Sequence, residues 1–138
     1  MPTLNLKIAP PCPSVQFAEL ARALTAITAD TLGKRAEVTA VTIEDIAPAR
    51  WFIGTHPPRR PTVQLEISIT AGTNTAAQKA AFIAAAFAEL QRQLAPDGLL
   101  EEASYVIVRE VAATDWGYGG RTQQARQLAR QARSPISA

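Results

Sequence analysis

The residue after the initiator methionine is a proline, and this position suggests acid–base chemistry. We expect Met1 to be removed, as is usual before a small residue, so that Pro2 becomes a free secondary amine. A free α-amino group titrates at about 7.7–8.0 in model peptides, and burial in an apolar pocket lowers its pKa by disfavouring the charged form. Such an amine is largely neutral at about pH 7, which suits a general base.

A second proline occupies a matching position, because the residues at 60–67, RPTVQLEI, closely repeat the MPTLNLKI at 1–8. The nitrogen of Pro61 lies inside the chain, in a tertiary amide that has no proton to donate and no basic lone pair. Of the two prolines, only Pro2 is therefore a candidate base.

The elements that position these prolines also occur twice, at a period of about 60 residues. Alternating apolar and polar residues, or runs rich in β-branched residues, predict strands. Apolar residues at spacings of three and four predict a helix after each first strand. The expected strands cover 2–8, 37–46, 62–69 and 103–111, and the expected helices cover 14–32 and 75–94. The last strand is apolar enough to suggest an interior position.

Several residues mark the expected ends and buried faces of these elements. Ser14 is expected as a helix N-cap, Gly33 as a helix terminator, and Thr75 with Gln78 as a capping box. The expected core-facing residues are Leu4, Leu6, Ile8, Phe17, Leu20, Leu24, Ile27, Val63, Leu65, Ile67, Ile69, Ile83, Phe87, Leu90 and Leu94.

Two β-α-β units of this kind predict an α+β fold, with a four-stranded mixed sheet and two helices on one of its faces. We expect one domain at 1–121, built from units at 2–55 and 61–120, each ending in a hairpin that contains tryptophan and glycine. An arginine-rich tail follows at 122–138; it is expected either to continue as a helix through Ala125 and Leu128 or to be disordered.

Two cations are expected beside the Pro2 amine. Lys34 and Arg35 lie between the first helix and the second strand, and the two strands of a β-α-β unit run parallel. Because parallel strands begin at the same end of a sheet, these residues should lie near the start of the first strand. They could hold a carboxylate and also depress the pKa of the amine. The alternative is that they only complement the dipole of the first helix.

The composition is that of an ordinary globular protein, with 47% hydrophobic and 19% charged residues, which excludes disordered and fibrous classes. The net charge of +2 comes from four arginines in the last eighteen residues, so it does not indicate a nucleic-acid surface. One cysteine cannot form an internal disulfide. The longest apolar run, 80–88, is too short to span a membrane, and no signal peptide is recognisable. We expect a cytoplasmic protein without membrane or nucleic-acid partners.

The N-terminal proline and its strand, the repeated β-α-β unit and the hairpin DWGYGG at 115–120 together resemble the tautomerase superfamily. In particular, residues 2–121 are similar to a fused, double-unit relative of 4-oxalocrotonate tautomerase. The resemblance implies an N-terminal proline that moves a proton between carbon and oxygen of a small enol or α-keto carboxylate, without a cofactor. It also implies a homo-oligomer, with a homotrimer expected for a double-unit chain.

The resemblance suggests further site residues. Trp51 falls where the family places an aromatic wall residue, and Trp116 occupies the same place in the second unit. Another branch, resembling macrophage migration inhibitory factor, uses a lysine after the first helix and a tyrosine in the last strand of a neighbouring subunit. Lys34 and Tyr105 match these two positions.

The family's arginines are missing from their usual places. The loop after the first strand reads APPCPS at 9–14, and Thr73 stands at the equivalent position of the second unit. The strand arginine is replaced by Ala40 and Tyr105. These departures argue against a substrate like that of the best-known member, and they leave open which cation binds the carboxylate.

Alternative functions remain at this stage. Relatives that hydrate, dehalogenate or decarboxylate use a protonated proline as a general acid, but the arginine pair expected for them after the third strand is absent. The order of elements also fits a ferredoxin-like binding module, including RNA-recognition modules. A scaffold without activity would follow if Met1 were retained.

Other polar residues have plainer interpretations. His56, Arg59 and Arg60 are expected in a solvated linker, and Arg121 is a similar case. A metal site is not expected, because His56 is the only histidine and Cys12 is the only cysteine. The glycines of the second hairpin fit a tight turn with positive φ better than a phosphate-binding loop.

Overall fold

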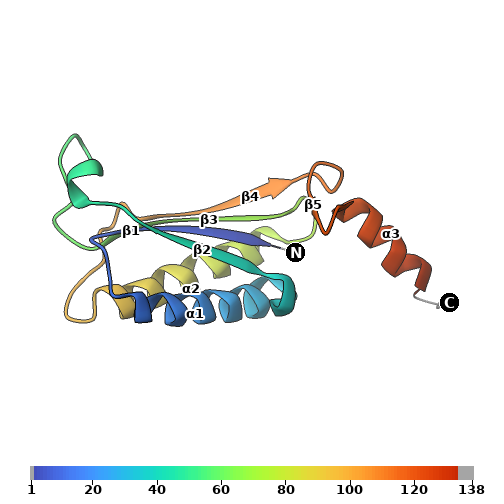
Figure 1. Cartoon of the computed structure of the whole chain (residues 1–138), viewed down its shortest axis with the longest axis horizontal. Helices are drawn as coiled ribbons and strands as arrows, with labels where there is room; N and C mark the ends of the chain where they lie inside the picture. Colours follow the sequence, from blue (N-terminus) through green and yellow to red (C-terminus); the bar gives the residue numbers. More distant parts are fainter. Residues whose placement is uncertain (1, 134–138) are drawn as a thin grey trace.

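The computed structural model describes residues 2–133, so Met1 and residues 134–138 lie outside the description. A four-stranded sheet in the order β2-β1-β3-β4 forms one layer. Both long helices cover the same face of this sheet (Figure 1), as the sequence predicts. The strands are β1 (Thr3–Ala9), β2 (Ala40–Asp45), β3 (Thr62–Thr70) and β4 (Tyr105–Val111), and the helices are α1 (Ser14–Leu32) and α2 (Ala76–Leu94). Short 3-10 helices, η1 (Ala36–Val38) and η2 (Pro48–Arg50), flank β2.

Each half of the sheet is a parallel pair, and the two halves meet in an antiparallel pair. β1 runs parallel to β2, β3 runs parallel to β4, and β1 pairs with β3 in the antiparallel sense. The repeated units are therefore arranged head to tail. Thr3 pairs with Ser68 and Ala9 pairs with Thr62, so that Pro2 and Pro61 lie at opposite ends of the sheet.

The core lies between the sheet and the two helices. The predicted inward residues of β1 and β3 are all buried, which confirms both alternating patterns; they are Leu4, Leu6, Ile8, Val63, Leu65, Ile67 and Ile69. Leu20 and Leu24 of α1 pack against them, together with Phe82, Ala86 and Leu90 of α2. Burying each large aliphatic or aromatic side chain contributes about 1.5–3 kcal/mol. This layer therefore stabilises the sheet, including the end of it that carries the candidate site.

The prediction for the buried face of α2 is wrong at one position. Ile83 is 39% exposed, whereas Phe82 is completely buried. Residues four apart lie above one another on a helix, and Phe82, Ala86 and Leu90 form the line that faces the sheet. Ile83 lies about 100° further round the helix.

Two further sequence predictions are corrected. β4 is an edge strand of the sheet, and its residues are only partly buried, so it is not an interior strand. Ser14 is the first residue of α1; the N-cap is Pro13, which forms no side-chain capping bond.

The ends of the helices next to the candidate site are capped as predicted. α1 ends at Gly33, whose φ of 67° places it in the left-handed region that glycine adopts without a steric cost. At the start of α2, the Thr75 side chain accepts a hydrogen bond from the Gln78 backbone at 3.1 Å. The Gln78 side chain in return accepts one from the Thr75 backbone at 2.9 Å, which completes the capping box.

We expect Thr75→Ala to lower the free energy of unfolding by about 1 kcal/mol, because it leaves a backbone N–H of α2 without its acceptor. Denaturant unfolding followed by circular dichroism measures the change. Ser14→Ala is the matched control, since Ser14 lies at the start of α1 but makes no capping bond. Equal effects of the two substitutions would contradict this account.

A two-residue hairpin follows each unit. Ile53 bridges His56 across Gly54 and Thr55, which both have positive φ. The second hairpin pairs β5 (Gly117–Tyr118) with β6 (Arg121–Thr122) across Gly119 and Gly120, whose φ values are 62° and 80°. These values are typical of tight hairpin turns, and they confirm the prediction made for the second hairpin.

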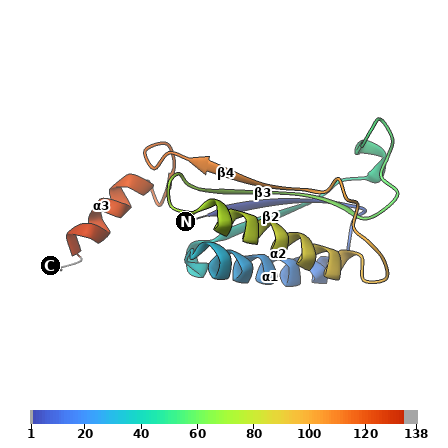
Figure 2. The same ribbon diagram turned by 180° about the vertical axis from the view of Figure 1, so that it is seen from behind.

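A third helix, α3 (Gln123–Arg133), follows the second hairpin directly. It projects beyond the end of the sheet at which β3 and β4 finish, as both views show (Figures 1 and 2). The helical alternative for the tail is thus confirmed for these residues, while 134–138 lie outside the described part. No helix among the described residues is long and apolar enough to cross a membrane.

Candidate active site

Pro2 lies at the start of β1, at the end of the sheet where β3 finishes. Its carbonyl oxygen accepts a hydrogen bond from the Ala40 backbone at 3.2 Å, and the residue is buried. The register that pairs Thr3 with Ser68 places Pro2 opposite Ile69, the residue before Thr70. β1 also pairs with β2 in the parallel sense, with Thr3 beside Ala40. The segment just before β2 therefore lies at the Pro2 end of the sheet, as predicted.

A cavity of about 240 Å³ opens at this end of the sheet. Lys34, Arg35 and Val38, which follow α1, line one side, and Thr70 and Thr73 at the end of β3 line another. Pro2 is not among the residues that line the cavity; the strand register places it opposite Ile69, which immediately precedes the wall residue Thr70.

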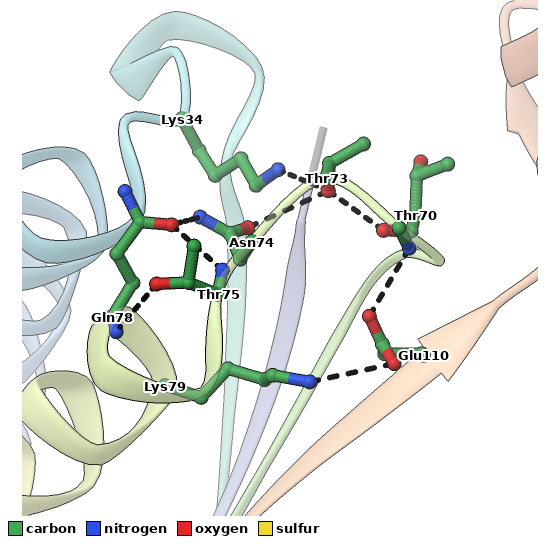
Figure 3. A network of polar contacts seen from close by, with 9 residues as sticks. Lys34, Thr70, Thr73, Asn74, Thr75, Gln78, Lys79 and Glu110 are labelled. Atoms are coloured by element: carbon green, nitrogen blue, oxygen red, sulfur yellow. Dashed lines mark hydrogen bonds and ion pairs between the residues drawn. The ribbon is translucent and has the colours of Figure 1, made fainter.

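Lys34 is held in a defined position on this wall. Gly33 reverses the chain direction at the end of α1, and the Lys34 ammonium then donates a hydrogen bond to the Thr73 hydroxyl at 2.8 Å. That hydroxyl donates in turn to the Thr70 carbonyl at 2.7 Å. Figure 3 shows the chain of contacts running from Lys34 through Thr73 to the end of β3.

The loop that carries Thr73 is fixed to α1 as well. The Asn74 side-chain amide donates to the Leu32 carbonyl at 2.9 Å, and this bond links the end of α1 to the loop before α2. The same amide donates to the Gln78 side chain at 3.0 Å, which belongs to the capping box. Thr73 is therefore anchored on both sides, and Lys34 with it.

The electrostatics of the cavity favour an anion. Burial lowers the pKa of Lys34 below its ordinary value, because the ammonium is partly removed from water. Its hydrogen-bond partner, the Thr73 hydroxyl, is neutral and supplies no opposite charge. No acidic residue lines the cavity within residues 2–133. Glu110, at the end of β4, instead pairs with Lys79 at 3.4 Å and accepts from the Gly72 backbone at 3.2 Å.

Arg35 is the more exposed of the two predicted cations. It lies 3.7 Å from Glu37, and both side chains are largely in solvent, where such a pair is worth about 0–1 kcal/mol. Arg35 therefore keeps much of its capacity to attract an anion to the cavity, whereas Lys34 is the cation that is fixed in place.

The remaining side of the cavity is formed by the second hairpin and α3. Tyr118 lines it together with Gln123, Gln127 and Arg130. The Tyr118 ring is covered by the guanidinium of Arg126, 3.8 Å from the ring centroid. The same guanidinium donates to the Tyr118 carbonyl at 2.9 Å, so Arg126 fastens α3 to the hairpin.

No protein-family model matches the sequence, and no curated protein matches it either. Solved structures do match over nearly the whole chain. A fused 4-OT described as a wild-type asymmetric trimer is 25% identical, with a TM-score of 0.78 over 90% of this chain and 98% of that chain. A native fused 4-OT is 28% identical, with a TM-score of 0.73 over 89% and 97% of the two chains. The chain has the tautomerase-superfamily fold.

A further match is macrophage migration inhibitory factor from Toxoplasma gondii, at 18% identity and a TM-score of 0.71 over 87% of this chain and 98% of that chain. Both branches named from the sequence are thus found among the structural neighbours. The predicted resemblance and the predicted fold class are confirmed.

The tautomerase fold brings only some of the predicted site residues together in one protomer. Pro2, Lys34 and Arg35 lie at one end of the sheet. Trp51 follows η2, beyond the opposite end of β2, and Tyr105 begins β4 at that same opposite end. Tyr105 is 64% exposed, so it is free to contact another chain.

Trp116 lies at the same end as Pro2 but lines a different space. It contacts a cavity of about 300 Å³ along the second hairpin, with Asp115 and Arg121. Its indole Nε1 is buried and has no hydrogen-bond partner among the described residues. Trp116 therefore supports the hairpin, and the cavity next to Pro2 is lined instead by Tyr118.

His56 and Cys12, for which the sequence suggested no catalytic role, do not line the cavity that contains Lys34 and Arg35. His56 is exposed in the first hairpin, and no group of three histidine, cysteine or acidic side chains within the described residues could hold a metal. Burial, together with the negative charge of Asp45, raises the pKa of Cys12, which disfavours a reactive thiolate.

Three cavity residues of α3 were missed from the sequence, namely Gln123, Gln127 and Arg130. Their spacing of four and then three residues places them on one face of a helix. That spacing was visible in the sequence and the tight hairpin was predicted, but the direction in which the hairpin turns α3 toward the cavity was not.

Proposed function

We propose that the protein is a cofactor-independent tautomerase or isomerase, acting on a small enol or α-keto carboxylate with Pro2 as the general base. One observation carries the proposal: in a tautomerase fold, the proline just before β1 lies near a cavity that, among residues 2–133, is lined by cations and by no acidic residue. The proposal requires removal of Met1, because only a free proline nitrogen can accept a proton.

The reaction needs no other reagent. The Pro2 amine accepts a proton from one position of the substrate and returns it to another as the double bond shifts. In ketonisation, the enol O–H bond and the C=C bond are lost while a C–H bond and a C=O bond form, so that atoms and electrons balance. Lys34 and Arg35, being positive, also favour the neutral form of a neighbouring amine.

Lys34 is the proposed carboxylate ligand, with Arg35 as a more exposed second cation. The Lys34 ammonium has three donors, and Thr73 takes one of them. The cavity of about 240 Å³ is below the range of about 300–1,000 Å³ typical of pockets for drug-sized ligands. We therefore propose a compact acid as the substrate.

Assembly as a homotrimer is also proposed, since fused 4-OT neighbours are described as trimers. Trp51 and Tyr105 lie too far along the sheet to reach Pro2 of their own protomer, and a neighbouring subunit could supply them. The edge strands β2 and β4 are available for such contacts.

We expect light scattering after size-exclusion chromatography to give three times the mass of the 14.8 kDa chain. Dilution of the sample is the control, because a true trimer keeps its mass over the working concentration range. A monomer at every concentration would contradict the proposed assembly and the roles of Trp51 and Tyr105 in trans.

The proposed activity is tested by following the ketonisation of phenylenolpyruvate, a generic enol acid, by ultraviolet absorbance. The protein is purified with its native N-terminus, and mass spectrometry establishes that Met1 is absent. Turnover above the buffer rate is the expected result. No turnover by protein that lacks Met1 would overturn the tautomerase proposal and favour the general-acid relatives.

A further inference from the structure

The Lys34 ammonium makes one hydrogen bond within residues 2–133, and its acceptor is the Thr73 hydroxyl at 2.8 Å. It forms no ion pair with any residue of that range. A hydroxyl has one proton to donate, and Thr73 gives it to the Thr70 carbonyl at 2.7 Å, since Oδ1 of Asn74 is further away, at 3.5 Å. The Thr73 oxygen is therefore left to accept from Lys34, which fixes the direction of this bond.

The backbone around Thr73 is tied to two other elements. On one side, the Gly72 N–H donates to the Glu110 carboxylate at the end of β4, at 3.2 Å. On the other side, the Asn74 amide donates to the Leu32 carbonyl at the end of α1, at 2.9 Å. The Thr73 hydroxyl is therefore an acceptor at a fixed place, to which the lysine side chain adapts.

A lysine needs such an acceptor if it is to meet a ligand in a defined position. The helical conformation of α1 ends at Gly33, and the Lys34 side chain that follows is long and flexible. Ordering a long side chain costs conformational entropy. When the free protein has already ordered it, that cost no longer weakens the binding of a ligand.

We propose that Thr73 is a positioning residue for the reaction, whose hydroxyl holds the Lys34 ammonium in place before the substrate carboxylate binds. This inference rests on the proposed function for the role of Lys34. Thr73 acts through Lys34 and does not touch the reacting atoms. Lys34 belongs to the unit at 2–55 and Thr73 to the unit at 61–120, so the second unit supports a site whose base lies in the first. From the sequence, Thr73 was notable only as the replacement of a family arginine.

The first test compares two substitutions of Thr73 in the ketonisation of phenylenolpyruvate. Thr73→Val removes the hydroxyl and should lower kcat/KM by about three- to tenfold, through KM rather than kcat. Thr73→Ser keeps the hydroxyl and should restore most of the parent value. Thr31→Val is the matched control: the Thr31 hydroxyl also donates to a backbone carbonyl, that of Ile27 at 2.7 Å, but Thr31 does not line the cavity. It should leave KM unchanged.

A double-mutant cycle separates positioning from a structural effect. In a Lys34→Met background there is no ammonium to position, so Thr73→Val should cause no further loss of kcat/KM. An equal loss in both backgrounds would overturn the inference, and so would failure of Thr73→Ser to restore activity. Thr73 is exposed, so Thr73→Val should keep the fold, and its melting temperature is measured alongside.

A second measurement does not depend on the reaction. NMR that detects lysine ammonium groups shows those whose protons exchange slowly with water because they are hydrogen-bonded. At slightly acidic pH, the Lys34 signal, assigned with Lys34→Arg, should be present in the parent and in Thr73→Ser and lost in Thr73→Val. No Lys34 signal in the parent, or an unchanged signal in Thr73→Val, would overturn the inference.

The two measurements distinguish failure of this inference from failure of the proposed function. A Lys34 signal that depends on Thr73, in a protein without ketonisation, would refute the reaction and leave the contact established. Ketonisation that depends on Lys34 but not on Thr73 would refute this inference alone.

Discussion

Replacing Pro2 with alanine is expected to lower the rate of phenylenolpyruvate ketonisation by about 100-fold, the low end of general-base contributions. The loss is partial because the variant still presents an N-terminal amine, although a primary one without the rigid ring. An additional uncleaved residue ahead of Pro2 should lower the rate further, by up to about 10⁴-fold. That extension converts the nitrogen into an amide while leaving every side chain unchanged.

The repeat supplies the control for this experiment. Pro61 precedes β3 as Pro2 precedes β1, and its carbonyl accepts from the Glu101 backbone at 2.8 Å, much as the Pro2 carbonyl accepts from Ala40. Its nitrogen is already an amide at the far end of the sheet. Pro61→Ala should therefore leave the ketonisation rate unchanged, and an unchanged rate for Pro2→Ala would refute the role of Pro2.

Replacing Lys34 with methionine should lower kcat/KM by about 10- to 100-fold, mainly by raising KM, because the substrate carboxylate loses its fixed charged partner. Lys79→Met is the matched control. Lys79 lies at the same end of the sheet but is directed toward Glu110 (Figure 3). If the two lysine variants were equally active, Lys34 would not be the carboxylate ligand.

The pH dependence should carry the same signature. Because burial lowers the pKa of Lys34, the alkaline limb of kcat/KM should fall at a lower pH than for an ordinary lysine. Lys34→Arg keeps the charge at all accessible pH values and should move that limb upward.

Stability should respond in the opposite direction to activity. A lysine whose folded pKa is below its unfolded value destabilises the fold below the folded pKa, where it is charged in both states. The penalty disappears as the pH rises through the unfolded pKa. The melting temperature of the parent should therefore rise relative to that of Lys34→Met as the pH increases toward the unfolded pKa, while activity falls. Thermal melts of the parent, Lys34→Met and Lys79→Met over a range of pH values check this.

The sequence predicted the parts of the site that depend on local rules. The start of β1 and the segment before β2 must meet because β1 and β2 are parallel, and this predicted that Lys34 and Arg35 lie at the Pro2 end of the sheet. Gly33 and the Thr75 capping box set the helix ends on either side, and both are signals carried by a few adjacent residues. These predictions needed no knowledge of how the two units pack.

The parts that depend on packing between units could not be read in the same way. Tyr105 matches the family by position along the chain, but the antiparallel pairing of β1 with β3 places the start of β4 at the far end of the sheet. Trp51 also lies at that end, because it follows β2, which runs parallel to β1. Ile83 and Phe82 are adjacent apolar residues, and only the orientation of α2 on the sheet decides which is buried. The approach of α3 to the cavity depends on a two-residue turn whose direction the composition does not reveal.

The head-to-tail arrangement of the two units gives the protomer a chemical polarity. The segment after α2 that corresponds to Lys34 and Arg35 contains Asp97, Glu101 and Glu102. A circular permutant that began at Pro61 would thus present its amine among acids, which raise the pKa of an amine and repel carboxylates. Under the proposed mechanism, only the first unit has to keep the residues that catalyse the reaction. The second unit is constrained by folding, by assembly and by the support that Thr73 gives to Lys34.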